Sequence, residues 1–113
     1  MKQKSPFPKR LKQARTRVGL SQRELGVRAG IDEFSASARM NQYEKGVHAP
    51  DYHMAQRIAA QLQVPTCYLF CEEDDIANMI TAYAQGTVEQ RQQALDSLLG
   101  KKVAEQAPDY LDD

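Results

Sequence analysis

Residues 19–30 read GLSQRELGVRAG, and residues 38–46, after a polar segment, read ARMNQYEKG. The first stretch predicts a helix that begins with a capping box. The Ser21 hydroxyl can accept a hydrogen bond from the amide of Glu24, while the Glu24 carboxylate can accept one from the amide of Ser21. Gly30 should end this helix, because glycine tolerates the left-handed backbone common after a helix. A sharp turn and a second helix are therefore expected.

The second helix should have one buried and one exposed face. Ala36, Met40 and Tyr43 follow the i, i+4, i+7 spacing of a buried stripe, and Leu25 and Ala29 give the preceding helix its own apolar face. The opposite face of the second helix holds short or planar hydrogen-bonding side chains, namely Ser37, Arg39, Asn41 and Gln42. Such side chains reach base edges and phosphates when a helix lies in the major groove of DNA. The pattern indicates a helix-turn-helix.

These residues resemble the phage repressor and Cro family of helix-turn-helix domains, also called the XRE family. The resemblance covers roughly Leu11 to Phe70, and its parts follow one another in the family's order. The matching residues are Arg15, Gly19, Leu20, Ser21, Gln22, Glu24, Leu25, Ala29, Gly30, Tyr43, Glu44, Gly46, Pro50, Ile58, Ala59, Leu62, Val64, Pro65, Tyr68 and Leu69. The resemblance implies an all-α, five-helix, lambda-repressor-like domain that binds double-stranded DNA.

The resemblance also assigns the residues of the recognition helix that would read DNA. Base-facing positions fall on Ser37, Ala38 and Arg39, and one turn later on Asn41 and Gln42. Arg39 is the strongest candidate for sequence reading, because a guanidinium can donate to both acceptors of a guanine. The alternative for Arg39 is a phosphate contact, which would set affinity without reading sequence.

Supporting roles follow from the same register. Gln22 should hold a backbone phosphate and brace the recognition helix. Lys45 and His48 flank Gly46, where the family commonly touches phosphate. Arg15 and Glu44 match a salt bridge that fixes the first helix against the recognition helix. Six further basic residues are expected to form a solvated rim, of which a minority reach phosphate: Lys9, Arg10, Lys12, Arg17, Arg23 and Arg28.

The chain departs from the family pattern at two places. Four residues more than usual lie between Gly30 and Met40, somewhere in residues 31–35. They either lengthen the turn or extend the second helix.

The second departure is Gly26, which stands where the family usually has alanine. Glycine inside a helix costs about 1 kcal/mol relative to alanine, but the missing methyl group permits a close approach between helices.

The rest of the first domain, residues 9–71, should complete the five helices after a short arm at residues 1–8. Pro8 suits a first-turn position. The first helix should bury Leu11, Ala14 and Val18; the fourth should bury Met54, Ala55, Ile58, Ala59 and Leu62; and a short fifth helix, residues 66–70, should contribute Tyr68, Leu69 and Phe70.

Residues 72–103 predict a two-helix extension, followed by an acidic tail at residues 104–113. The acidic run at residues 72–75 should head the first of these helices, where the macrodipole favours negative charge. Its expected apolar face comprises Ile76, Met79, Ile80 and Tyr83. A second capping box, Thr87 with Gln90, should begin a helix with Val88, Leu95, Leu98 and Leu99 inside, ended by Gly100 near Lys101 and Lys102. The extension either lies back on the first domain or, as we favour, pairs with a second subunit.

The net charge of zero hides a segregation of charge. Residues 1–50 hold 11 Lys and Arg against 4 Asp and Glu, whereas residues 51–113 hold 4 against 11. A basic half attracts phosphate, and an acidic half should face away from the duplex.

The sequence also lacks an apolar run of the ~20 residues that a membrane span requires. We therefore expect a cytoplasmic protein.

Cys67 and Cys71 could suggest a metal or redox site. Two thiols cannot complete a four-ligand zinc site, so we expect reduced core thiols, with redox sensing as the weaker alternative. No catalytic motif is present, and neither a metal nor another cofactor is expected.

The sequence favours a DNA-binding transcriptional regulator, a repressor that binds a palindromic operator as a homodimer. The alternative is an antitoxin or other regulator whose C-terminal extension binds a partner protein.

Overall fold

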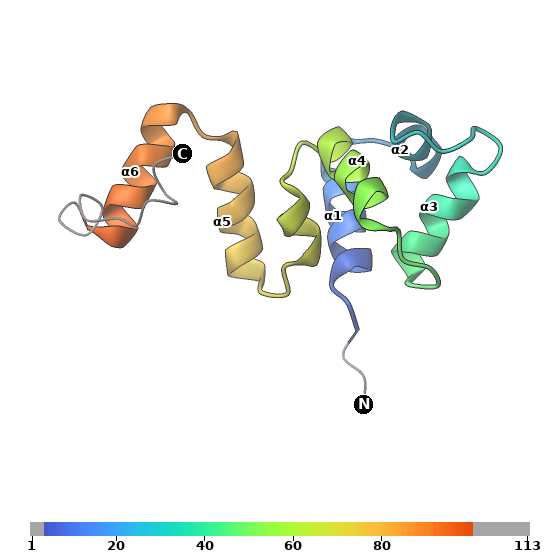
Figure 1. Cartoon of the computed structure of the whole chain (residues 1–113), viewed down its shortest axis with the longest axis horizontal. Coiled ribbons are helices and arrows are strands. Elements are labelled where there is room, and N and C mark those ends of the chain that lie inside the picture. Colours follow the sequence, from blue (N-terminus) through green and yellow to red (C-terminus); the bar gives the residue numbers. More distant parts are fainter. Residues whose placement is uncertain (1–3, 101–113) are drawn as a thin grey trace. The chain divides into compact units, whose positions relative to one another are not determined.

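The computed structural model describes residues 4–100, and within this range the protein is entirely helical (Figure 1). The helices are α1 (Phe7–Val18), α2 (Gln22–Arg28), α3 (Ala36–Lys45), α4 (Tyr52–Leu62), the 3₁₀ helix η1 (Thr66–Phe70), α5 (Asp74–Gln85) and α6 (Val88–Leu99). The chain divides into two compact units, one up to Thr81 and one from Ala82 onward. None of the described helices is long and apolar enough to cross a membrane. The all-α class and the order of the helices are confirmed.

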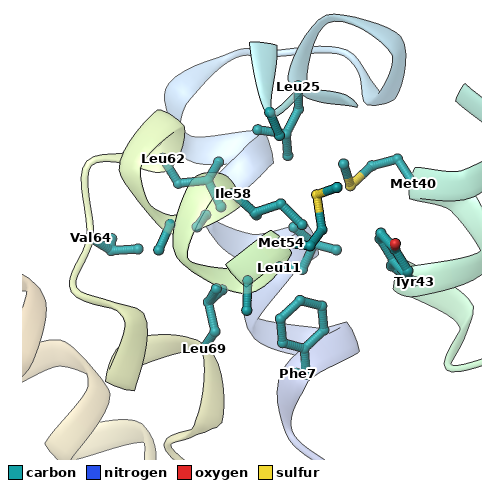
Figure 2. Packing of buried hydrophobic residues seen from close by; sticks show 14 of the residues in the cluster. Phe7, Leu11, Leu25, Met40, Tyr43, Met54, Ile58, Leu62, Val64 and Leu69 are labelled. Atoms are coloured by element: carbon teal, nitrogen blue, oxygen red, sulfur yellow. The ribbon is translucent and has the colours of Figure 1, made fainter. Parts of the chain in front are cut away.

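The core of the first unit draws on each of its first five helical elements. The largest fully buried side chains are Leu11, Leu25, Met40, Ile58, Leu62 and Leu69. Figure 2 shows them converging, with Met40 of α3 facing Met54 of α4. Burying one such side chain stabilises the fold by about 1.5–3 kcal/mol. The apolar stripes expected for α2, α3 and α4 are therefore confirmed.

The start of α1 differs from the expectation. The helix begins at Phe7, inside the segment expected to be an arm, and Phe7 is buried with its ring centroid 5.5 Å from that of Phe70. The amide of Phe7 donates to the Ser5 hydroxyl at 3.1 Å, which holds the entry to the helix. At the other end Val18 is 36% exposed, so its expected place in the core is wrong. Val18 is the last helical residue, and the left-handed Gly19 turns the chain there.

Two residues of η1 also lie outside the expected core. Tyr68 and Leu69 are buried as expected, but Phe70 is half exposed and Cys67 is exposed. In a 3₁₀ helix, side chains three apart point the same way, so Cys67 and Phe70 share the outer side. Cys71 is only partly buried. The expectation of two core thiols is therefore wrong for Cys67 and holds only partly for Cys71.

Arg10, expected in a solvated rim, is buried with 3% exposure. Its guanidinium donates to the carbonyls of Cys71 at 2.7 Å and Glu72 at 3.0 Å, and it pairs with the Asp74 carboxylate at 3.0 Å. Lys9 reaches the same carboxylate at 3.1 Å. Hydrogen bonds from Lys9 and Arg10 lower the pKa of Asp74. The acidic start of α5 therefore binds α1, a role that helix capping alone did not predict.

The apolar faces expected for α5 and α6 are largely uncovered. In α5, Ala77 is buried and Ile80 packs partly against the core, whereas Ile76, Met79 and Tyr83 are 47%, 53% and 38% exposed. In α6, the Thr87–Gln90 capping box is present, but none of the helix's residues is buried. The expected burial of Val88 and Leu98 is thus wrong within one chain, where they are 79% and 66% exposed. Lys101, Lys102 and the tail at residues 104–113 lie outside the described residues.

Candidate nucleic-acid interface

The capping box at the start of α2 is formed as expected. The Glu24 amide donates to the Ser21 hydroxyl at 3.0 Å, and the Ser21 amide donates to the Glu24 carboxylate at 2.9 Å. These hydrogen bonds lower the pKa of Glu24, because they favour its charged form. At the other end, Gly30 has a φ of 94°, and the Ile31 amide donates to the Gly26 carbonyl at 2.9 Å. The helix therefore has a defined start and stop.

The extra residues before the recognition helix lengthen the turn, and they do not extend the helix. α2 ends at Arg28 and α3 begins at Ala36. Ile31 is buried, and the Arg57 guanidinium of α4 donates to the Ala29 carbonyl at 2.8 Å. Further along, the Ser35 amide donates to the Asp32 carbonyl at 3.0 Å. The turn is thus attached to the core at its beginning and folded on itself at its end.

Gly26 of α2 lies in close contact with Ala36, the first residue of α3. A Cβ atom at this position would lie 2.8 Å from the Ala36 Cβ and 3.0 Å from the Ala36 carbonyl oxygen. Real Cβ atoms essentially never come within 2.8 Å of another atom. The close helix approach expected from the glycine is therefore confirmed, and the alanine usual in the family would push α3 away from α2.

α3 presents the two faces that its sequence predicts. Ala36, Met40 and Tyr43 are buried. The side chains outside this stripe are Ser37, Ala38 and Arg39, which are exposed, and Asn41 and Gln42, which are partly exposed. Within residues 4–100 the Arg39 guanidinium makes no hydrogen bond or salt bridge. The polar side of α3 is therefore available to a ligand outside the chain.

A hydrogen-bonded network fixes α3 against α1 and α2. The Arg15 guanidinium donates through two nitrogens to the two oxygens of Glu44, at 2.5 and 3.1 Å, and through the third to the Leu20 carbonyl at 3.0 Å. The Gln22 amide donates to the Asn41 side chain at 3.3 Å and to Glu44 at 3.1 Å. The hydrogen bond to Glu44 raises the pKa of Arg15. The expected Arg15–Glu44 salt bridge is thus present, and Gln22 braces α3.

Lys45 and His48 are exposed and border a groove of about 870 Å³ between the loop after α3 and the start of α1. Phe7, Pro8 and Tyr43 are among its apolar lining residues, and Lys4 and Glu72 also line it. The sequence patterns missed Lys4 here, because residues far apart in the chain form this groove. Its cations suit a phosphate group.

No group of three or more His, Cys, Asp or Glu that could hold a metal ion occurs in the part of the chain that the structure describes. This agrees with the arrangement around Cys67 and Cys71, which are free thiols. The side chains grouped around α3 are instead hydrogen-bond donors, amides and cations.

Comparisons with known proteins agree with this geometry. A helix-turn-helix family model matches residues 11–69, which run from α1 to η1. No curated protein matches the chain. The crystal structure of the transcriptional regulator BswR is similar, with 44% sequence identity and a TM-score of 0.78 over 81% of this chain and 91% of that chain. The chain therefore belongs to the helix-turn-helix family of the phage repressor and Cro, or XRE, type.

Proposed function

We propose that this protein is a repressor that occupies a palindromic operator as a homodimer in the cytoplasm, with α3 in the major groove. Family membership and the likeness to BswR make it a DNA-binding transcriptional regulator. One observation carries the placement of α3 in the groove: its polar side is exposed, while its opposite side is fixed by the core and by the network around Glu44. A rigid helix with free planar donors suits the reading of base edges.

The proposal assigns the side chains around α3 to two tasks. Arg39 donates to a guanine, and its neighbours on α3 contact the adjoining base pairs; these neighbours are Ser37, Ala38, Asn41 and Gln42. Lys45 and His48, at the groove after α3, contact backbone phosphates. Gln22 braces α3 with both of its amide hydrogens, so it reaches a phosphate only by giving up its longer hydrogen bond, the one to Asn41.

The exposed apolar side chains of α5 and α6 support the dimer. Met79, Val88 and Leu98 are each more than half exposed, and Ile76 and Tyr83 are 47% and 38% exposed. Large exposed apolar surface commonly marks a site of protein–protein interaction. In a two-fold dimer these side chains would be buried, and two copies of α3 would enter successive major grooves about 34 Å apart.

Selection of bound sequences from a random duplex pool tests the DNA-binding proposal. We expect an inverted repeat with a guanine at a fixed position in each half. The Arg39→Ala variant should lose preference for that guanine and retain binding to random duplexes. If cognate and random duplexes weaken equally, Arg39 is a phosphate contact; if no sequence is enriched, sequence-specific binding is refuted.

Leu98→Glu tests the dimer, since this exposed side chain can change without disturbing the fold. We expect sedimentation to show a dimer for the natural chain and a monomer for the variant, with at least tenfold weaker binding to the selected repeat. Gln93→Glu is the matched control, because it adds the same charge on another face of α6. Leu95 shares a face with Leu98, and Gln93 lies two residues before Leu95, which places it on the opposite side of the helix. A natural chain that is monomeric yet binds the repeat would refute the dimer.

The second candidate function is a partner-binding regulator, such as the antitoxin of a toxin pair. The same exposed faces of α5 and α6 favour it, together with the excess of acidic residues in the second half of the chain. Under this alternative, Leu98→Glu leaves DNA binding intact and abolishes binding of the partner protein.

A further inference from the structure

Phe34, in the turn before the recognition helix, is 93% exposed, more than any other large apolar side chain in the described range. Exposing a phenylalanine forgoes the stabilisation that its burial would give. The turn that carries it is nevertheless ordered. The Phe34 amide donates to the Asp32 carboxylate at 3.1 Å, the Ser35 amide donates to the Asp32 carbonyl at 3.0 Å, and Ile31 is buried. The ring is therefore held outward by a folded turn.

The position of Phe34 in the chain places it beside the proposed DNA-reading surface. It lies two residues before Ala36, the first residue of α3, and three to five residues before the exposed Ser37, Ala38 and Arg39. The N-terminal residues of a recognition helix contact base edges. A side chain that projects from the preceding turn consequently lies near the base pairs next to those contacts.

The charges around Phe34 are compatible with nucleic acid. Its two acidic neighbours are both engaged within the protein: Asp32 accepts the Phe34 amide, and Glu33 pairs with Arg23 at 3.4 Å. On its other side, α3 carries Arg39 without a protein partner among the described residues. A DNA duplex would therefore meet an exposed apolar ring in a stretch of chain where Glu33 is neutralised by Arg23 and Arg39 follows five residues after Phe34.

We propose that Phe34 is a DNA-contacting residue that packs against the methyl group of a thymine in the major groove, next to the base pairs that α3 reads. The thymine methyl is the one apolar group that base pairs display in that groove, and phenylalanine is among the side chains that contact it. This inference rests on the proposed function, because it requires α3 to occupy the groove. It assigns a role in specificity to the longer turn.

The test uses the full-length protein and the duplex selected from a random pool, with each thymine replaced in turn by uracil, which lacks only the methyl group. We expect uracil at one position in each half-site to weaken binding of the natural chain about fourfold, the factor expected for one buried methyl group. Phe34→Ala should bind the thymine duplex about fourfold more weakly and be indifferent to uracil at that position. Its thermal unfolding midpoint should match that of the natural chain, because the side chain is exposed.

Tyr52→Ala is the matched control, since it removes another exposed aromatic ring, at the start of α4. This variant should keep the full uracil penalty. The inference is overturned if Phe34→Ala binds the thymine duplex as tightly as the natural chain, or if it keeps the uracil penalty at every position. It is also overturned if the variant binds DNA normally but represses transcription poorly, which would make Phe34 a protein contact. Failure of the proposed function is a separate result, in which the natural chain enriches no sequence.

Discussion

The α2–α3 region and the α5–α6 region carry the same local signals and reach different outcomes. Each contains a capping box, Ser21 with Glu24 and Thr87 with Gln90, and both boxes are formed. Leu25 of α2 is fully buried, whereas no residue of α6 is buried. Capping and apolar spacing therefore determine that a helix forms, but they do not determine what covers its apolar face.

The sharpest test of this contrast compares the same truncation in the two regions. We expect Leu25→Ala to lower the free energy of unfolding by about 2–5 kcal/mol, because it leaves a cavity in the core. Leu98→Ala should change it by less than about 0.5 kcal/mol at concentrations where the protein is monomeric. Denaturant unfolding of both variants measures the difference. A large loss for Leu98→Ala in the monomer would mean that α6 is covered by its own chain.

Removal of Glu44 tests the network that fixes α3. Its side chain is 4% exposed, and Arg15 and Gln22 both donate to it. Breaking a buried pair costs about 3–5 kcal/mol. Because the Arg15 side chain retains 16% exposure, we expect Glu44→Ala to cost about 2–3 kcal/mol. Arg23→Ala is the control, since the Arg23–Glu33 pair is exposed and worth about 0–1 kcal/mol. Equal losses in chemical denaturation would contradict this prediction.

Substitution of two glycines compares a very close helix contact at Gly26 with a less crowded position at Gly86. Gly26→Ala should destabilise the protein by about 1–2 kcal/mol, because overpacking against Ala36 outweighs the gain in helix propensity. It should also weaken DNA binding, since α3 must move. In the control Gly86→Ala the nearest atoms lie at 3.3–3.4 Å, so this substitution should cost less than Gly26→Ala. Thermal unfolding and mobility shift together measure both effects; a Gly26→Ala protein with normal DNA affinity would refute the role of the close approach.

The smallest expected effect concerns Asp74, which joins the start of α5 to α1. Its pKa is lowered by hydrogen bonds from Lys9 and Arg10. A carboxylate with a lowered pKa stabilises the folded state above its unfolded pKa of about 3.9, and this contribution is lost as the pH falls through the folded pKa. Asp74→Asn should therefore be less stable than the natural chain at pH 7, with the difference vanishing in acid. A difference that persists at pH 2 would assign the effect to something other than this charge.

Local sequence patterns predicted most of the fold and the framework of the candidate site. The capping boxes, the buried stripe of α3 and the apolar set of α4 depend on residues within one or two turns of each other, so the sequence shows them directly. The Arg15–Glu44 pair could be predicted because the family resemblance shows which positions far apart in the chain form a salt bridge. The outward polar side of α3 followed from the same periodicity.

The sequence by itself therefore determined that the chain is all-α, where its helices begin and end to within a few residues, and which family it resembles. Only the tertiary structure decided that Phe7 and Arg10 are buried, that Cys67 and Phe70 face outward, and that the four extra residues form a turn presenting Phe34. The physical reason is the range of the interactions. A helix and its caps are stabilised by hydrogen bonds between near neighbours in the chain, whereas burial depends on partners such as the Cys71 carbonyl, 61 residues from Arg10, which no local pattern identifies.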